Sequence, residues 1–259
     1  MQPKWSSKFE IKPGKWVFVP TLESAKQGAE IKKAVEENWK IPAFYFHLRS
    51  GGHVEAIRAH LGHKFFAHVD VENFFGSINR SRVTRHLGEW FSYPVARTMA
   101  NASTVEHPDK AKVFMVPYGF VQSQAVAGLC LDRSKLGRYL KKLAKNPAVA
   151  VSVYVDDIIV SCDEQKLCIF ILETLEKAAS ESKFTLNPDK KEGPAEMITV
   201  FNIEIKQDSM QLSDARFQKF IDAVATASSG HQRRGILSYV KSVNGLQLEE
   251  LVLTAGIND

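Results

Sequence analysis

The amino-acid sequence predicts an α+β fold, in which helices and short antiparallel strands are interspersed. Two kinds of segment indicate it: stretches with apolar residues at helical spacing, such as 22–39 and 164–182, and short aromatic or β-branched runs, such as 64–69 and 149–161. These segments do not alternate with the regular strand–helix–strand rhythm of a doubly wound sheet. An α+β arrangement therefore fits the pattern better.

The composition is that of an ordinary soluble protein. Of 259 residues, 44% are hydrophobic and 24% are charged, so the chain can bury a sizeable core, as one large domain or as two to three small lobes. No apolar run approaches the roughly 20 residues needed to cross a bilayer, and the first residues lack the apolar core of a signal peptide. We therefore expect a cytoplasmic protein with no membrane partner.

Net charge indicates the kind of binding partner, and cysteine content indicates the state of the thiols. A formal net charge of +5 suits a polyanion such as nucleic acid, although a merely solvated basic surface explains it equally well. Cys130, Cys162 and Cys168 are an odd number at spacings that match no zinc pattern. They are expected to be reduced thiols in the core.

The first third of the chain predicts a helix over 22–39, which Ile41 and Pro42 end. A strand is expected over 43–48, a turn at Gly51 and Gly52, and a short helix over 54–61. The next strand, 64–69, delivers Asp70 at its end.

The middle of the chain predicts helices over 81–90, capped by Asn79 or Ser81, and over 93–102. A longer helix is expected from 121 to 145. Residues 149–161 contain two β-branched runs around Asp156 and Asp157, which is typical of a tight hairpin.

The remaining chain predicts a helix over 164–182, short strands at 197–205 and 210–212, a helix that begins at Ser213, and a last helix over 233–244.

The aspartates are the strongest indication of chemistry. Asp156 and Asp157 lie inside an apolar hairpin, where unpaired carboxylates are costly, and Asp70 also ends a strand. Three convergent carboxylates can hold two Mg²⁺ ions, because Mg²⁺ prefers hard oxygen ligands. The alternative is that the aspartate pair is a polar turn and Asp70 a helix cap.

The segment Tyr154–Asp157 (YVDD) resembles the metal-binding tetrapeptide of reverse transcriptases. Four further segments resemble motifs of that family in the same order, over roughly residues 44–244. They are Asp70–Ile78, similar to the first aspartate motif of bacterial enzymes, Pro117–Ser123, Leu186–Lys190, and Phe201–Ile205, similar to the primer-grip strands.

Two positions depart from the family pattern. Tyr118 stands where most relatives have glutamine, which affects nucleotide selection, and Gln124 stands where they usually have proline. No additional signature segment of retron enzymes is clear, and no maturase or endonuclease extension is found. The resemblance is therefore to bacterial reverse transcriptases of the defence-associated (antiphage or abortive-infection) or retron-like group.

The resemblance implies a right-hand polymerase fold. Residues 1–66 with 91–116 would form the fingers, 67–90 with 117–205 the palm, and 206–259 a short thumb. It also implies an RNA-directed DNA polymerase that uses two Mg²⁺ ions, which Mn²⁺ can replace, and whose partners are an RNA template, a DNA primer and deoxynucleotides. Because the thumb is short, we expect help from a structured non-coding RNA, a partner protein or self-association.

Roles for individual residues follow from the same resemblance. Metal ligands are expected to be Asp70, Asp156, Asp157 and the backbone carbonyl of Val71. Nucleotide contacts are expected from Phe75 as a steric gate, Tyr118, Gly119, Lys190, Arg49 and Arg58. Primer or template contacts are expected from Tyr154, Gln122, Ser123, Phe201 and Asn202.

Other basic and aromatic positions stay open. The basic stretches 80–85, 133–145 and 231–234 either track a nucleic-acid backbone or are solvated helix faces. His47, His53, His60, His63 and His68 lie close in sequence without zinc spacing, and they are expected to make polar or nucleic-acid contacts. Two other functions remain: polymerisation without a template or from a protein primer, and a catalytically silent RNA-binding subunit.

Overall fold

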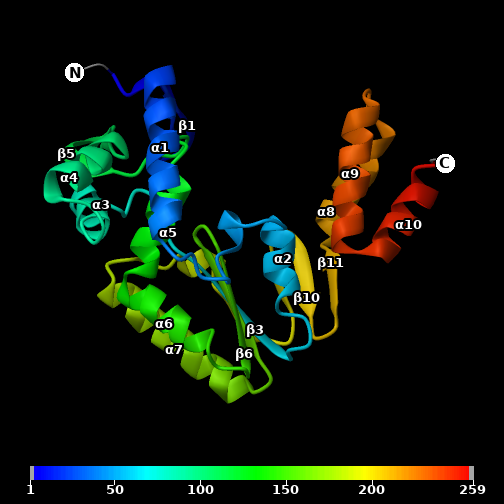
Figure 1. Cartoon of the computed structure of the whole chain (residues 1–259). Coiled ribbons are helices and arrows are strands. Elements are labelled where there is room, and N and C mark those ends of the chain that lie inside the picture. The colour runs from blue at the N-terminus through cyan, green and yellow to red at the C-terminus, as the bar shows by residue number, and fades with distance from the viewer. Residues whose placement is uncertain (1–2, 257–259) are drawn as a thin grey trace.

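The computed structural model of the chain describes residues 3–256. Figure 1 shows helices and sheets arranged in a U, with α1 and α5 on one arm and α8 to α10 on the other. A sheet of four antiparallel strands lies between the arms, in the order β6-β7-β3-β8. These strands are β3 (Phe65–Asp70), β6 (Val149–Tyr154), β7 (Asp157–Cys162) and β8 (Glu192–Ala195).

Helices cover one face of this sheet. They are α5 (Ser123–Asp132), α6 (Lys135–Leu143) and α7 (Gln165–Glu181), and their apolar faces share one core with α1 (Leu22–Asn38). The three cysteines are free and buried in this region, as expected. Among residues 3–256, no helix has both the length and the apolar content required to cross a membrane.

The single helix expected over 121–145 was wrong, because the chain breaks between α5 and α6. Ser134 adopts an extended conformation, and its hydroxyl accepts a hydrogen bond from the Gly137 amide at 3.0 Å. A serine that caps a new helix competes with continuation of the old one.

The strand expected over 43–48 was also wrong. The segment forms a 3-10 turn, η1 (Phe46–Leu48), and pairs with β6 at one bridge between Tyr45 and Val153. Its aromatic residues pack in the core: Tyr45 is fully buried and lies edge-on to Trp39, with ring centroids 5.7 Å apart.

The chain begins with a hairpin that the sequence did not reveal. Strands β1 (Trp5–Lys12) and β2 (Lys15–Pro20) pair antiparallel, and the Phe18 amide donates to the Tyr118 carbonyl at 2.9 Å. This contact joins the hairpin to the chain just before α5.

The same arm of the U contains two further helices and a second small hairpin. Helix α3 (Arg80–Leu87) is capped by Asn79, as expected, and α4 (Tyr93–Ala102) follows it. Strands β4 (Val105–His107) and β5 (Lys110–Met115) complete this region.

The other arm has its own apolar core. The expected strand 197–205 is divided into β9 (Ile198–Val200) and β10 (Ile203–Lys206), because Phe201 and Asn202 both take positive φ and turn the chain. Strand β11 (Ser209–Leu212) completes the sheet, and helices α8 (Asp214–Ala225), α9 (Gly230–Val243) and α10 (Gly245–Thr254) pack against it. Helix α2 (Gly52–Arg58), which is the expected short helix, also contributes to this core.

Candidate active site

The three aspartates converge at one end of the four-stranded sheet. Asp70 ends β3 directly opposite Asp157, which begins β7, and Asp156 lies in the two-residue turn between β6 and β7. One carboxylate oxygen from each aspartate lies within 4.8 Å of the others. The convergence expected from the sequence is therefore present. Asp156 does lie in a hairpin turn, as the alternative also held, but Asp70 belongs to strand β3 and does not cap a helix.

Backbone hydrogen bonds fix this turn. Val155 takes a φ of 60°, which a β-branched residue adopts only when its surroundings impose it. The Val155 amide donates to His47 Nδ1 at 3.0 Å, and the Val71 amide donates to the Asp156 carbonyl at 2.8 Å. The loop that carries Asp156 is thus positioned from two other parts of the chain.

His47 is suited to this role because it is neutral. Burial lowers its pKa to about 4. A neutral imidazole keeps Nδ1 free to accept the Val155 amide hydrogen.

The negative charges of the aspartates are close to one another and partly compensated. Burial raises the pKa of Asp156 to about 6, and the nearby charges of Asp157 and Asp70 add to the effect. Asp70 accepts a hydrogen bond from Lys190 Nζ at 2.7 Å, and Asp157 lies 2.8 Å from His68 Nε2.

The charges of the aspartates also shift the pKa of Lys190. Burial would lower the pKa of Lys190, but the hydrogen bond with Asp70 and the charges of the aspartates outweigh burial and raise it. Lys190 is therefore a firmly charged ammonium at the edge of the cluster.

This donor set fits a divalent cation that prefers oxygen. The ligand atoms available are hard carboxylate oxygens. Burial and the neighbouring carboxylates raise the pKa of Asp156, so a cation at this point would stabilise its charged form. Within residues 3–256, these aspartates are the one group of at least three His, Cys, Asp or Glu side chains with the proximity to hold a metal ion.

Two of the residues expected to contact a nucleotide, Phe75 and Tyr118, pack against each other. Phe75 is 5% exposed, and its ring meets Tyr118 edge-on with centroids 4.6 Å apart. Burial, with the charges of Asp156 and Asp70, raises the pKa of Tyr118, so its hydroxyl stays protonated. Lys15 Nζ lies 4.5 Å from the centre of the Tyr118 ring.

Position 119 requires glycine, because a side chain there would be strained. Its φ is +99°, and a Cβ built there would lie 2.3 Å from the Phe18 carbonyl oxygen. The backbone at Gly119 therefore makes a close approach, as expected, but among the described residues its neighbour is strand β2.

Arg49 and Arg58 point to internal partners. Arg49 bonds the Ala43 carbonyl and lies over the Phe46 ring at 4.9 Å. Arg58 pairs with Glu55 at 2.9 Å and also bonds the Ser242 carbonyl, which links α2 to α9. The expectation that Arg58 clamps a triphosphate is not supported, because these contacts direct it to the C-terminal helices.

Gln122 and Ser123 were expected to touch primer or template, but their side chains are 1% and 3% exposed. Ser123 donates to the Pro117 carbonyl at 2.6 Å, and Gln122 Nε2 donates to the Ala102 carbonyl at 3.3 Å. These side chains leave no surface for a nucleic acid and instead fix the start of α5.

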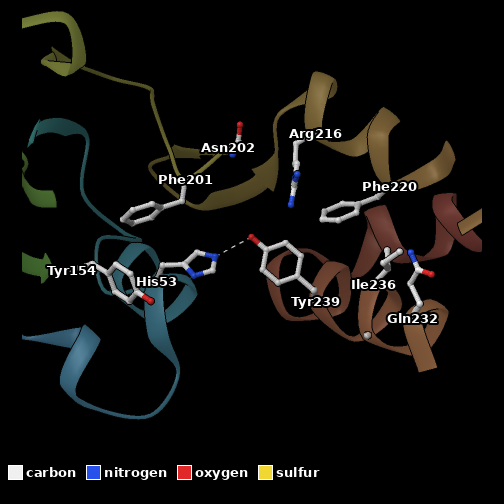
Figure 2. Close-up of a pocket in the computed structure, with 10 residues that line it drawn as sticks. His53, Tyr154, Phe201, Asn202, Arg216, Phe220, Gln232, Ile236 and Tyr239 are labelled. Atoms are coloured by element: carbon white, nitrogen blue, oxygen red, sulfur yellow. Dashed lines mark hydrogen bonds between the residues drawn. The ribbon is translucent and has the colours of Figure 1, made fainter. Parts of the chain in front are cut away.

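Tyr154, Phe201 and Asn202 do come together, around a pocket of about 560 Å³ (Figure 2). The opposite wall is formed by residues of α8 and α9: Arg216, Phe220, Gln232, Gly235, Ile236 and Tyr239. Of these, the sequence had indicated only Gln232, as part of the basic stretch 231–234. His53 closes one side, with its Nε2 2.9 Å from the Tyr239 hydroxyl. The pocket thus combines several aromatic rings with one guanidinium group.

Sequence reasoning did not place Lys15, His47 and His68 beside the aspartates, although both histidines belong to the group that was expected to make polar contacts. A signal existed only for His68, which lies two residues before Asp70 and so shares its face of β3. The other two reach the site through contacts distant in sequence. His60, also in the histidine cluster, is fully buried between the hydroxyls of Ser152 and Ser161, each at 2.8 Å.

Comparison with known proteins gives a consistent result. Residues 12–211 match the family described as reverse transcriptase (RNA-dependent DNA polymerase). No curated protein matches this chain.

Solved structures with the same fold include a foamy viral protease–reverse transcriptase in complex with double-stranded DNA, with a TM-score of 0.52 and 16% identity over 96% of this chain and 42% of that one. A telomerase from Candida albicans, in complex with a fragment of telomeric RNA, has a TM-score of 0.56 and 10% identity over 92% of this chain and 53% of that one. The foamy viral enzyme in complex with an RNA/DNA hybrid gives a TM-score of 0.51 and 17% identity over 95% of this chain and 32% of that one.

These likenesses confirm the polymerase-type α+β fold with antiparallel sheets. The chain spans between 32% and 53% of the length of these solved structures.

Proposed function

Because this chain belongs to the reverse transcriptase family, we propose that it is an RNA-directed DNA polymerase that adds deoxynucleotides to the 3′-hydroxyl of a DNA primer. The convergence of Asp70, Asp156 and Asp157 within 4.8 Å is the observation that supports the proposal most strongly. Binding of RNA alone does not require such a cluster.

We propose that Asp70, Asp156 and Asp157 hold two Mg²⁺ ions, that Mn²⁺ can replace them, and that the Val71 carbonyl completes one site. When bound, two such ions supply the positive charge that stabilises the attacking and the leaving oxygen of an in-line phosphoryl transfer. His68 and His47 then act as positioning residues: His68 holds the Asp157 carboxylate, and His47 holds the turn of Asp156.

The remaining residues would bind and select the nucleotide. The Lys190 ammonium, now on Asp70, is close enough to the cluster to bind a triphosphate oxygen instead. Phe75 and Tyr118 together present a rigid aromatic wall, which would exclude a 2′-hydroxyl by shape. Arg49 remains a candidate for a triphosphate contact because its side chain is exposed.

The pocket in Figure 2 is proposed to receive the end of the primer strand. Tyr154 and Phe201 offer rings for stacking, with centroids 5.3 Å apart, and Arg216 offers a phosphate contact. This proposal assigns the region before 206 to fingers and palm, as the sequence predicted, and the region after it to a short thumb.

The biological setting is also part of the proposal. The motif resemblance favours a bacterial antiphage or retron-like role in the cytoplasm, with a structured RNA, a partner protein or a second copy of the chain as a further partner. A single bare chain with full activity would contradict the need for such a partner.

The direct experiment is incorporation of labelled deoxynucleotides on a primed RNA template with Mg²⁺, for the native chain and Asp156→Asn. We expect incorporation by the native chain alone. Incorporation that persists without template but requires the aspartates would favour the template-independent function. Absence of incorporation in both, with co-purified RNA and partners present, would favour the silent RNA-binding subunit.

A further inference from the structure

Two basic stretches that are far apart in the sequence come together on the side of the molecule away from the primer pocket. Arg82 and Arg85 lie on α3, whereas Lys135 and Arg138 lie on α6. With Arg133 and Lys183 they line one hollow of about 490 Å³. Figure 1 shows α3 and α6 on the opposite side of the molecule from α8 and α9.

The charge in this hollow is strongly one-sided. Its lining contains six Arg or Lys side chains and one carboxylate, Glu181, which pairs with Lys135 at 3.1 Å. Arg133 pairs with Glu89 at 3.3 Å. The other four cations have no salt bridge within the described part of the chain; they are Arg82, Arg85, Arg138 and Lys183.

One of these cations, Arg82, also lacks a hydrogen-bond partner for one of its nitrogens. Arg82 Nη2 donates to the Ser182 carbonyl at 2.6 Å, and the guanidinium lies over the Phe184 ring at 4.7 Å. Its Nη1 is shielded from solvent and has no hydrogen-bond partner among the described residues. A buried charged donor without a partner is costly, and an oxygen of a bound anion would satisfy it.

A second hollow, of about 370 Å³, continues the first. The two share Ser81 and Arg85, and the second adds Arg97 and Tyr93. Tyr93 is 71% exposed, so its ring is accessible for stacking at this end of the hollow. We call the residues of the two hollows that carry this surface the basic track: Arg82, Arg85, Arg97, Arg138, Lys183 and Tyr93.

We propose that the basic track binds an unpaired segment of RNA outside the catalytic cleft, through its phosphates and one stacked base. Successive cations ending in an exposed ring match a chain of phosphates that carries a base better than they match a single small anion. The choice of RNA rests on the proposed function, which brings an RNA to the protein. The track would contact the sugar-phosphate backbone of the RNA, and it is separate from the aspartates.

The test uses the full chain and a labelled, unstructured RNA strand. The catalytic cleft is first saturated with an unlabelled, short RNA/DNA primer–template duplex, so that anisotropy reports binding elsewhere. We compare the native chain with Arg85→Gln/Arg138→Gln, and with Lys166→Gln/Lys206→Gln as a control that removes the same charge from exposed positions outside the track.

We expect the track variant to bind this RNA at least about tenfold more weakly, and the slope of log affinity against log salt to fall by about 1.4, since each phosphate contact to a single strand contributes about 0.7. The control should keep native affinity. Tyr93→Ala should lose about tenfold and Tyr93→Phe should lose nothing, because stacking requires the ring and not the hydroxyl. Equal loss in the control, or no loss in the track variant, would overturn the proposal.

Two further arms separate the alternatives. Displacement of the RNA by inorganic phosphate at constant ionic strength would identify a site for free anions and overturn the proposal that the ligand is a polynucleotide. Nucleotide incorporation on the short duplex should be unchanged in the track variant. A chain that lacks incorporation but shows track-dependent RNA binding would refute the proposed polymerase and leave the track intact.

Discussion

Removing the charge of Asp156 should stabilise the fold in the absence of metal, although it abolishes the proposed activity. The pKa of this carboxyl rises from 3.8 to about 6 on folding, because it is buried near Asp157 and Asp70. A shift of about 2 units corresponds to about 3 kcal/mol, and partial exposure to solvent reduces our expectation to about 2 kcal/mol. Asp156→Asn avoids this cost.

The dependence on pH has a definite sign. As pH rises from 3.8 to about 6, the unfolded chain loses the Asp156 proton before the folded chain does, so the native protein loses stability over that interval. Above about pH 6 the loss is complete, and below pH 3.8 it is absent. The variant should therefore be more stable than the native chain at pH 7.5 and equal to it near pH 3.8.

Urea denaturation in EDTA at these two pH values measures the difference. Mg²⁺ should then stabilise the native chain more than the variant, because a ligand that binds only the folded state stabilises it. Asp208→Asn, at an exposed turn position, removes the same charge and should change nothing. A variant less stable than the native chain at pH 7.5 without metal would refute this account of the site.

Three other perturbations give distinct outcomes. Gly119→Ala should lower the free energy of unfolding by about 3 kcal/mol, since its Cβ meets the Phe18 carbonyl at positive φ; a change below about 1 kcal/mol in urea melts contradicts the contact. Burial lowers the pKa of His60 to about 3, so the unfolded chain takes up a proton first as pH falls below 6.5. Stability should fall by about 2 kcal/mol between pH 6.5 and 5, with a smaller slope in His60→Gln; equal slopes in the two proteins speak against it. Phe75→Val should raise ribonucleotide incorporation relative to deoxynucleotide by about tenfold in single-nucleotide assays, and an unchanged ratio removes Phe75 from the selection of the sugar.

Local patterns account for most of what could be predicted. The hairpin around Asp156 and Asp157 was visible because both of its strands are buried and β-branched, so their propensity and tertiary position agree. Strand β1 lacked such a pattern: seven of its eight residues are exposed, and its pairing with β2 could not be read from apolar alternation. The break between α5 and α6 was hidden because one capping serine decides it.

Long-range contacts explain what the sequence could not provide about the site. A motif predicts Lys190 as a triphosphate ligand, but nothing in the neighbouring sequence indicates that its ammonium lies on Asp70. Arg58 was chosen because arginine binds phosphate, yet its position on α2 brings it against α9. In both cases the chemistry of the side chain was clear and its partner depended on the folded arrangement.

The three aspartates differ in the contacts that surround them. A cluster of three carboxylates repels itself, and the chain offsets this with the charge of Lys190 on Asp70 and with a hydrogen bond between His68 and Asp157. Asp156 has neither contact, and it is the aspartate whose pKa is raised. The carboxylate that lacks a direct cationic partner thus lies at the turn, where His47 holds the backbone, the side chain is partly open to solvent, and the charge of Lys15 only partly opposes the raised pKa. An entering divalent cation gains most at this carboxylate, and we therefore expect Asp156 to control metal affinity more strongly than Asp70 does.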